Sequence, residues 1–315
     1  MSLLLELLQV VVPVFLIVAL GYGCLKTQAL PDALLDPLVK FQISVLVPCL
    51  LFLAMYRVDL GTAINLWVLG AFFIASTIVF FLAMIAARWF WGRRPGEAVS
   101  VGFAAFFPNA VMLGIPITER AFGTEALASV FGIIAFHSLY NYFLGFVMME
   151  AVRQDSETIL AGLRKAMTTS LKNPLMMGLL AGMAANLVAL PIPDVVEDAL
   201  DMLAAAAIPT ALFAMGGVLT RYRLRDQIGE SLMVSFFSLI AQPGLAWLVA
   251  DPLMGLDDAY VKAAVIMAAM PTGINSYIFA TIYNRGVGTA ANSVLIGTVL
   301  SVISITGWLA FLGGI

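Results

Sequence analysis

Ten apolar stretches, each long enough to cross a lipid bilayer, constrain the fold of this chain more than any other feature. A spanning helix takes about 20 residues, and it closes its backbone hydrogen bonds internally because hydrocarbon offers no partners. We therefore predict an all-α polytopic membrane protein with ten transmembrane helices. These helices are expected roughly at residues 5–25, 34–56, 64–87, 97–118, 126–149, 173–190, 195–220, 228–250, 260–283 and 290–312.

Composition excludes several classes of protein. Soluble domains contain about 25% charged residues, whereas this chain contains 11% charged and 62% hydrophobic residues. A net charge of −3 without a basic run argues against nucleic acid as a partner. Cys24 and Cys49 both fall in apolar stretches, and His137 is the only histidine. We therefore expect no disulfide framework, no metal site and no cofactor.

The distribution of Lys and Arg predicts the orientation in the membrane. Cytoplasmic loops carry an excess of these residues. If the N-terminus lies outside, thirteen of the 16 Lys and Arg residues fall in cytoplasmic loops, which leaves Arg57, Arg120 and Lys262 outside. Glu6 and the lack of a preceding basic residue favour a first spanning helix over a cleaved signal peptide. We predict that both termini are outside and that residues 152–172 form a cytoplasmic linker.

The two halves of the chain resemble each other at a nearly constant offset, and each half holds five segments. An odd number of segments forces the second half to enter the membrane inverted. We predict a 5+5 inverted repeat of residues 1–151 and 173–315, an arrangement typical of secondary transporters with the site at the repeat interface. The matching pairs are Pro13 with Pro174, Gly21 with Gly182 and Pro48 with Pro209, each 161 apart, and Pro108 with Pro271, 163 apart.

Both halves interrupt their fourth segment with a proline, in the sequences FFPNAVMLGIPI and AAMPTGINSYIF. Proline removes a backbone donor and opposes the preceding turn, and the resulting half-helix N-termini can bind an anion without a dedicated cation. A structural kink repaired by neighbouring side chains is the alternative interpretation. If the breaks bind substrate, the candidate residues are Pro108, Asn109, Pro271, Thr272, Gly273, Asn275 and Ser276.

The fifth segment is unusually polar for a spanning helix, with the sequence FHSLYNYF. Ionisable residues inside a membrane are functional candidates, so His137 is a possible coupling residue, although a packing role is the alternative. The middles of the ten predicted helices lack Asp and Glu, which disfavours a sodium/proton antiporter built on paired carboxylates. Proton symport, sodium symport and uniport driven by the membrane potential stay open.

The motif PNAVMLGIP followed by Phe122-Gly123, the motif MPTGINSYIFATIYN and the motif IPTALFAMGGVL resemble the auxin efflux carrier family. That family includes plant auxin exporters and bacterial permeases for malate or malonate, and the resemblance covers essentially the whole chain. It implies a ten-helix fold related to bile acid:sodium symporters. Helices 1, 2, 6 and 7 would form a scaffold, often dimeric, and helices 3–5 and 8–10 a moving transport domain.

The resemblance further implies elevator-like transport of an organic anion held where helices 4 and 9 cross. Because related carriers use polar groups of helix five beside this crossover, Tyr140 and Asn141 join the candidate substrate-binding residues. The implied partners are a small organic anion, the lipid bilayer and a second copy of the chain. The long central hydrophilic loop of many plant exporters is missing, which favours a short member in a bacterial inner membrane.

Other classes of function fit the sequence less well. The spanning helices carry no protease motif and no Ser/His pair on one helix face, so we expect no enzyme. A channel would favour rings of charged or carbonyl groups around an axis. A receptor with a transporter fold, which binds a carboxylate without moving it, would share every feature described above. We predict a secondary carrier for a small organic anion, with a receptor or a channel as alternatives.

Overall fold

The structure is a computed structural model, and it describes residues 2–57, 65–123, 126–152, 174–221 and 227–313. These ranges are helical apart from turns, short connections and one isolated β-bridge. The predicted linker at 152–172 lies, after its first residue, outside the described residues. Six helices run without interruption: α1 (Ser2–Lys26), α5 (Leu66–Trp91), α8 (Leu127–Val152), α10 (Pro174–Leu187), α11 (Asp194–Leu219) and α16 (Val287–Phe311).

Two further helical segments contain turns of π-helix. The first runs through η1 (Asp32–Leu34), α2 (Leu35–Phe41), η2 (Gln42–Leu46) and α3 (Val47–Arg57), and the second through α12 (Ile228–Phe236), η5 (Phe237–Ala241), α13 (Gln242–Leu248) and η6 (Val249–Leu253). A proline stands two residues after η2 and two residues after η5, at Pro48 and Pro243. A π turn shifts the hydrogen-bond pattern by one residue and so accommodates a residue that has no N–H.

The remaining two helical segments are broken. The first consists of α6 (Pro95–Phe106), the π turn η3 (Ala110–Gly114) and α7 (Ile115–Phe122), and the second of α14 (Asp258–Ala268) and α15 (Ile274–Tyr283). Seven helical segments among the described residues are long and apolar enough to span a membrane. The other three predicted stretches fall on the two broken segments and on α10, which has only 14 residues.

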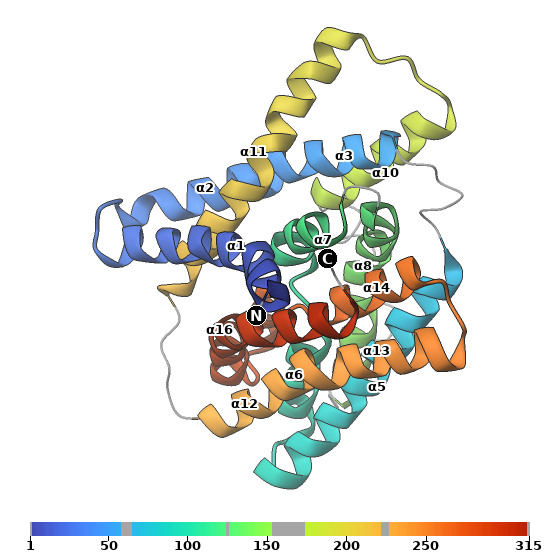
Figure 1. The fold of residues 1–315 in the computed structure, drawn as a ribbon. Coiled ribbons are helices and arrows are strands. Elements are labelled where there is room, and N and C mark those ends of the chain that lie inside the picture. Colours follow the sequence, from blue (N-terminus) through green and yellow to red (C-terminus); the bar gives the residue numbers. More distant parts are fainter. Residues whose placement is uncertain (1, 58–64, 124–125, 153–173, 222–226, 314–315) are drawn as a thin grey trace.

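Glycines let two pairs of helices approach closely. A Cβ atom on Gly21 of α1 would lie 2.0 Å from the backbone oxygen of Phe213 in α11, and one on Gly182 of α10 would lie 2.2 Å from that of Phe52 in α3. Only glycine permits such an approach. The two contacts correspond to each other at the offset of 161 found in the sequence. Figure 1 shows these four helices grouped with α2 on one side of the molecule.

A core rich in aromatic residues packs one half of each broken helix on the other side of the molecule, among α5, α6, α8, α12, α13, α15 and α16; Figure 1 shows where these helices lie. The rings of Phe103, in the last turn of α6, and Phe279, in the middle of α15, stack with their centroids 3.9 Å apart. At one end of this group, Arg93 pairs with the fully buried Glu230 at 2.7 Å. The hydrogen bond to Glu230 raises the pKa of Arg93, so the guanidinium keeps its charge.

Candidate functional site

The two broken helices meet at their breaks. The residues between their halves are extended and run antiparallel, with a bridge between Pro108 and Thr272. The N–H of Asn109 donates to the carbonyl of Pro271 at 2.8 Å, and the N–H of Gly273 donates to the carbonyl of Phe107 at 2.8 Å. Five of the predicted site residues thus lie beside one another, although more than 160 positions separate the two segments in sequence.

Side chains at the crossing repair the backbone that the breaks disrupt. Pro108 has no N–H, so the carbonyl of Ala104 loses the donor it would have in a continuous helix. The hydroxyl of Thr272 donates to that carbonyl at 2.9 Å. The hydroxyl of Ser276 donates to the carbonyl of Gly273 at 2.7 Å. Thr272 and Ser276 are fully buried, so these two predicted site residues hold the backbone of the crossing together.

Helices α12–α13 cap two further carbonyls at the breaks. Gln242 Nε2 donates to the carbonyl of Phe106 at 3.3 Å and to Ser76 Oγ at 2.9 Å. Ser238 Oγ donates to the carbonyl of Met270 at 3.2 Å. Gln242 thus joins the second π-bulged segment to both α5 and α6. Carbonyls at the crossing are therefore largely engaged as acceptors.

The N–H groups in the helical turns that follow each break remain available as hydrogen-bond donors. The first turn of η3 leaves the N–H groups of Val111 and Met112 without an intrahelical acceptor, and the first turn of α15 does the same for Ile274 and Asn275. Such helix starts carry a partial positive charge of about half an elementary charge. The crossing therefore offers hydrogen-bond donors and positive potential, which suits an anion more than a cation.

A cavity of about 120 Å³ lies beside the crossing, which we call the crossover cavity. Asn109 and Asn275 contribute its polar side chains, and the other lining residues are aliphatic or Met from α2, η2, η3, α11, α15 and α16. Within the wall, Asn109 Nδ2 lies 3.3 Å from the sulfur of Met215. The structure thus brings the side chains of Asn109 and Asn275 to one space. Sequence reasoning did not single out Met112 and Met215, although both lie within the quoted family motifs.

The polar residues of the fifth segment are not in the lining of the crossover cavity. Buried His137 packs edge-on against the ring of Phe107 with centroids 5.1 Å apart, and its Nδ1 lies 3.4 Å from the carbonyl of Ile134. The hydroxyl of Tyr140 shares a hydrogen bond with Thr77 Oγ1. Asn141 is fully buried, and neither polar atom of its amide has a hydrogen-bond partner. Of these three residues, His137 contacts the crossing through Phe107, and Tyr140 contacts α5.

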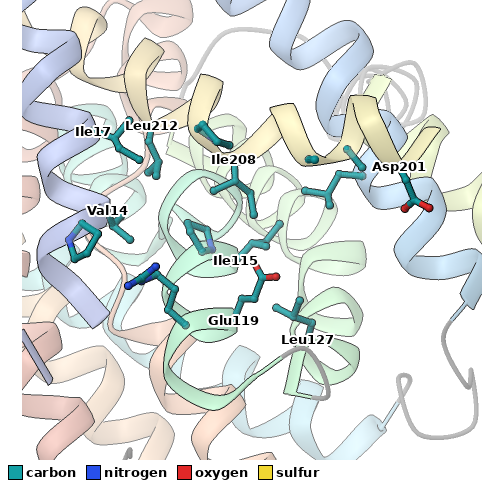
Figure 2. A pocket seen from close by; sticks show the side chains of 15 residues that line it. Val14, Ile17, Ile115, Glu119, Leu127, Asp201, Ile208 and Leu212 are labelled. Atoms are coloured by element: carbon teal, nitrogen blue, oxygen red, sulfur yellow. The ribbon is translucent and has the colours of Figure 1, made fainter. Parts of the chain in front are cut away.

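A second, larger cavity of about 490 Å³ lies between α1, α3, α7, α8 and α11. Figure 2 shows its wall, where Glu119 and Asp201 stand among apolar side chains such as Val14, Ile17 and Leu212. Size alone would favour this cavity as a ligand site. Asp201 is neutralised by its ion pair with Arg57, but the carboxylate of Glu119 would repel an anion. The smaller crossover cavity is therefore the better candidate for an anion.

Among the described residues in the wall of the larger cavity, Arg120 is the one that is basic, and its guanidinium is already engaged. Its Nη2 donates to the carbonyl of Gln9 at 2.8 Å and its Nε to that of Val10 at 3.0 Å. Pro13 lacks the N–H that would otherwise bond the carbonyl of Gln9. Arg120 thus donates to the carbonyl of Gln9, which Pro13 leaves without a donor, and it links α7 to α1.

Comparisons with known proteins agree over nearly the full length of the chain. The family model described as "Membrane transport protein" matches residues 7–309. A protein of Rhizobium meliloti (strain 1021) named "Putative malonate transporter" is 26% identical, over 96% of this chain and 95% of that protein. "Auxin efflux carrier component 5" of Arabidopsis thaliana is 22% identical, over 98% and 97%. An "Uncharacterized transporter" of Methanothermobacter thermautotrophicus is 25% identical, over 95% and 96%.

Proposed function

The chain belongs to the membrane transport protein family, which includes the auxin efflux carriers that its motifs resemble, and from that premise we propose that it is a secondary carrier for a small organic anion. It is a multi-pass membrane protein whose relatives are transporters and not enzymes. The names of those relatives point to carboxylates of the malonate or auxin type. We place the substrate in the crossover cavity, beside Asn109 and Asn275.

One observation carries this proposal. At the crossing, the carbonyls of Ala104, Phe106 and Phe107 accept hydrogen bonds from other segments, whereas four N–H groups at the starts of η3 and α15 have no acceptor within their helices. A carboxylate can accept from such donors, while a cation would find those carbonyls occupied. The side-chain amides of Asn109 and Asn275 add donors in the same cavity.

We propose that ten spanning segments form an inverted repeat with both termini outside. The equivalent glycine contacts at Gly21 and Gly182 support the repeat. The ion pairs support the segment order, because each joins residues that the predicted topology puts at the same membrane face. These pairs are Arg57 with Glu197 and Asp201, Arg93 with Glu230, and Arg221 with Asp36. A reporter fused after Ile315 should therefore report the outer compartment of a bacterial inner membrane, and a cytoplasmic signal would refute the topology.

We propose an elevator-type motion for the transport step. The scaffold would comprise α1–α3, α10 and α11, through which a homodimer would form, and the remaining helices would move. Both cavities lie between α11 and the segment η3–α7: Asn109 and Met112 line the smaller one, Ile115 and Pro116 the larger. Sliding this segment along α11 would enlarge one cavity at the expense of the other, and it would break the bonds from Arg120 to α1.

The driving force has several candidates. For a monoanion, a membrane potential of 100 mV supplies about 2.3 kcal/mol towards efflux, enough for a gradient of roughly fiftyfold at about 1.4 kcal/mol per decade. Uniport driven by the potential therefore needs no coupling ion. Proton symport through His137 and sodium symport would instead make uptake depend on pH or on sodium.

Uptake of radiolabelled carboxylates into proteoliposomes tests the function. A saturable uptake of an anion, abolished by cross-linking α11 to α7 through engineered cysteines in a protein without Cys24 and Cys49, supports an elevator carrier. Binding without uptake identifies a receptor instead. Uptake that does not saturate, and that persists in the cross-linked protein, identifies a channel. Comparison with and without a sodium gradient and a pH gradient separates the modes of coupling.

A further inference from the structure

We infer that the crossover cavity selects a monocarboxylate with a short aliphatic body and rejects dicarboxylates of similar size. This inference rests on the proposed function, because it concerns the substrate class of the same site. It follows from the number of charges that the wall can balance, from the polarity of the rest of the wall and from the volume of the cavity.

The polar part of the cavity balances about one negative charge. Its donors are the amides of Asn109 and Asn275 and the N–H groups that begin η3 and α15. All of these donors are neutral groups, and each helix start contributes only about half an elementary positive charge. Two such starts together match the single charge of one carboxylate.

The rest of the wall is apolar. Val39 and Ile43 come from α2 and η2, Val218 and Leu219 from α11, and Ile278 and Val294 from α15 and α16. Among the lining residues that the structure describes, none is Lys, Arg or His. A second carboxylate would lose its hydration against these side chains, and an unpaired buried ion costs several kcal/mol. This cost corresponds to at least a hundredfold loss of affinity.

In the part of the chain that the structure describes, the basic residues nearest in sequence to the lining do not supply a second charge to the cavity. Arg221, two positions after Leu219, donates to the carboxylate of Asp36 at 2.6 Å. Lys40 is exposed, and it follows Val39 directly on α2. Neighbouring residues on a helix point in different directions, so the side chain of Lys40 diverges from that of Val39.

The volume limits the length of the substrate. Sites for drug-sized ligands measure about 300–1,000 Å³, whereas the crossover cavity measures about 120 Å³. Met112 and Met215 in the wall can adapt to an aliphatic body, because the Met side chain is unbranched and flexible. A carboxylate with a few carbon atoms fits this description.

Binding to the purified full-length protein by calorimetry tests the inference with four probes: butyrate, monomethyl malonate, malonate and succinate. The pH is set so that every carboxyl is ionised. Monomethyl malonate and malonate are nearly equal in size and differ by one charge. We expect butyrate and monomethyl malonate to bind at least about a hundredfold more tightly than malonate and succinate.

A pair of variants tests whether the absence of charge in the described cavity wall causes the preference for monocarboxylates. Ile43→Lys adds a cation to the lining, and Ile43→Met keeps a similar size without charge. We expect Ile43→Lys to reduce the preference for the monoanion at least tenfold and Ile43→Met to leave it unchanged. Malonate binding at least as tightly as its monoester in the natural protein would overturn the inference while the anion-carrier function stands. If none of the probes and no larger carboxylate binds to folded protein, the proposed function itself fails.

Discussion

Gly21→Ala and Gly23→Ala should change the stability of this protein in opposite directions, although both place the same methyl group on the same helix. In α1, a Cβ on Gly21 would lie 2.0 Å from the backbone oxygen of Phe213, whereas one on Gly23 would have nothing within 4 Å. Ordinary van der Waals contact begins at 3.4 Å. The two helices must therefore separate by more than 1 Å to accept Ala at position 21, because the atoms that the Cβ meets belong to a helix backbone and not to a flexible side chain.

The magnitudes follow from packing and helix propensity. Overpacking a tight contact typically costs about 1–3 kcal/mol, and a clash with backbone belongs at the upper end of that range. At position 23 the substitution creates no clash, and Ala in a helix interior is favoured over Gly by about 1 kcal/mol. Position 21 lies in the same helix and gains the same propensity, so the two variants should differ by the clash alone, about 3 kcal/mol in the free energy of unfolding.

Thermal unfolding of both variants in one detergent provides the assay. Gly21→Ala should melt below the natural protein, and Gly23→Ala at or above it. Gly182→Ala in α10 should behave like Gly21→Ala, because its Cβ would lie 2.2 Å from the backbone oxygen of Phe52. Equal melting temperatures for the two α1 variants would refute the close approach of α1 to α11. A lower melting temperature for Gly21→Ala without a lower melting temperature for Gly182→Ala would refute the equivalence of the two contacts.

Three further substitutions separate binding from support of the backbone. Asn109→Ala should weaken anion binding roughly ten- to hundredfold, since losing a hydrogen bond to a charged ligand costs about 1.5–3 kcal/mol. Unchanged affinity for the anion together with a lower melting temperature would show that Asn109 only repairs the helix. Thr272→Val should destabilise the protein by about 1–3 kcal/mol, because the buried carbonyl of Ala104 loses its donor. Thr272→Ser keeps the hydroxyl and should retain most of the stability in the same thermal-unfolding measurement. Asn141→Leu should raise the melting temperature, because it removes a buried amide whose polar atoms have no hydrogen-bond partner. A lower melting temperature would indicate that this amide does form hydrogen bonds in the folded protein.

Several features of this protein follow from the sequence alone because their causes are local. Hydropathy over about 20 residues predicts a spanning segment wherever it occurs, and seven of the predicted stretches coincide with unbroken or π-bulged helices of sufficient length. Proline acts on its own turn, so Pro108 and Pro271 marked the two breaks correctly. The offset of 161 between Gly21 and Gly182 likewise matches a pair of close contacts in the structure.

The roles of individual side chains at the crossing depended on the tertiary structure. Whether the hydroxyl of Thr272 faces a ligand or the carbonyl of Ala104 depends on a segment 168 positions away. Met215 borders the crossover cavity only because α11 packs beside η3. Hydrogen bonds and cavity walls form between elements whose relative placement no local pattern specifies. The sequence therefore located the breaks, whereas packing decided which residues repair the backbone there and which line the crossover cavity.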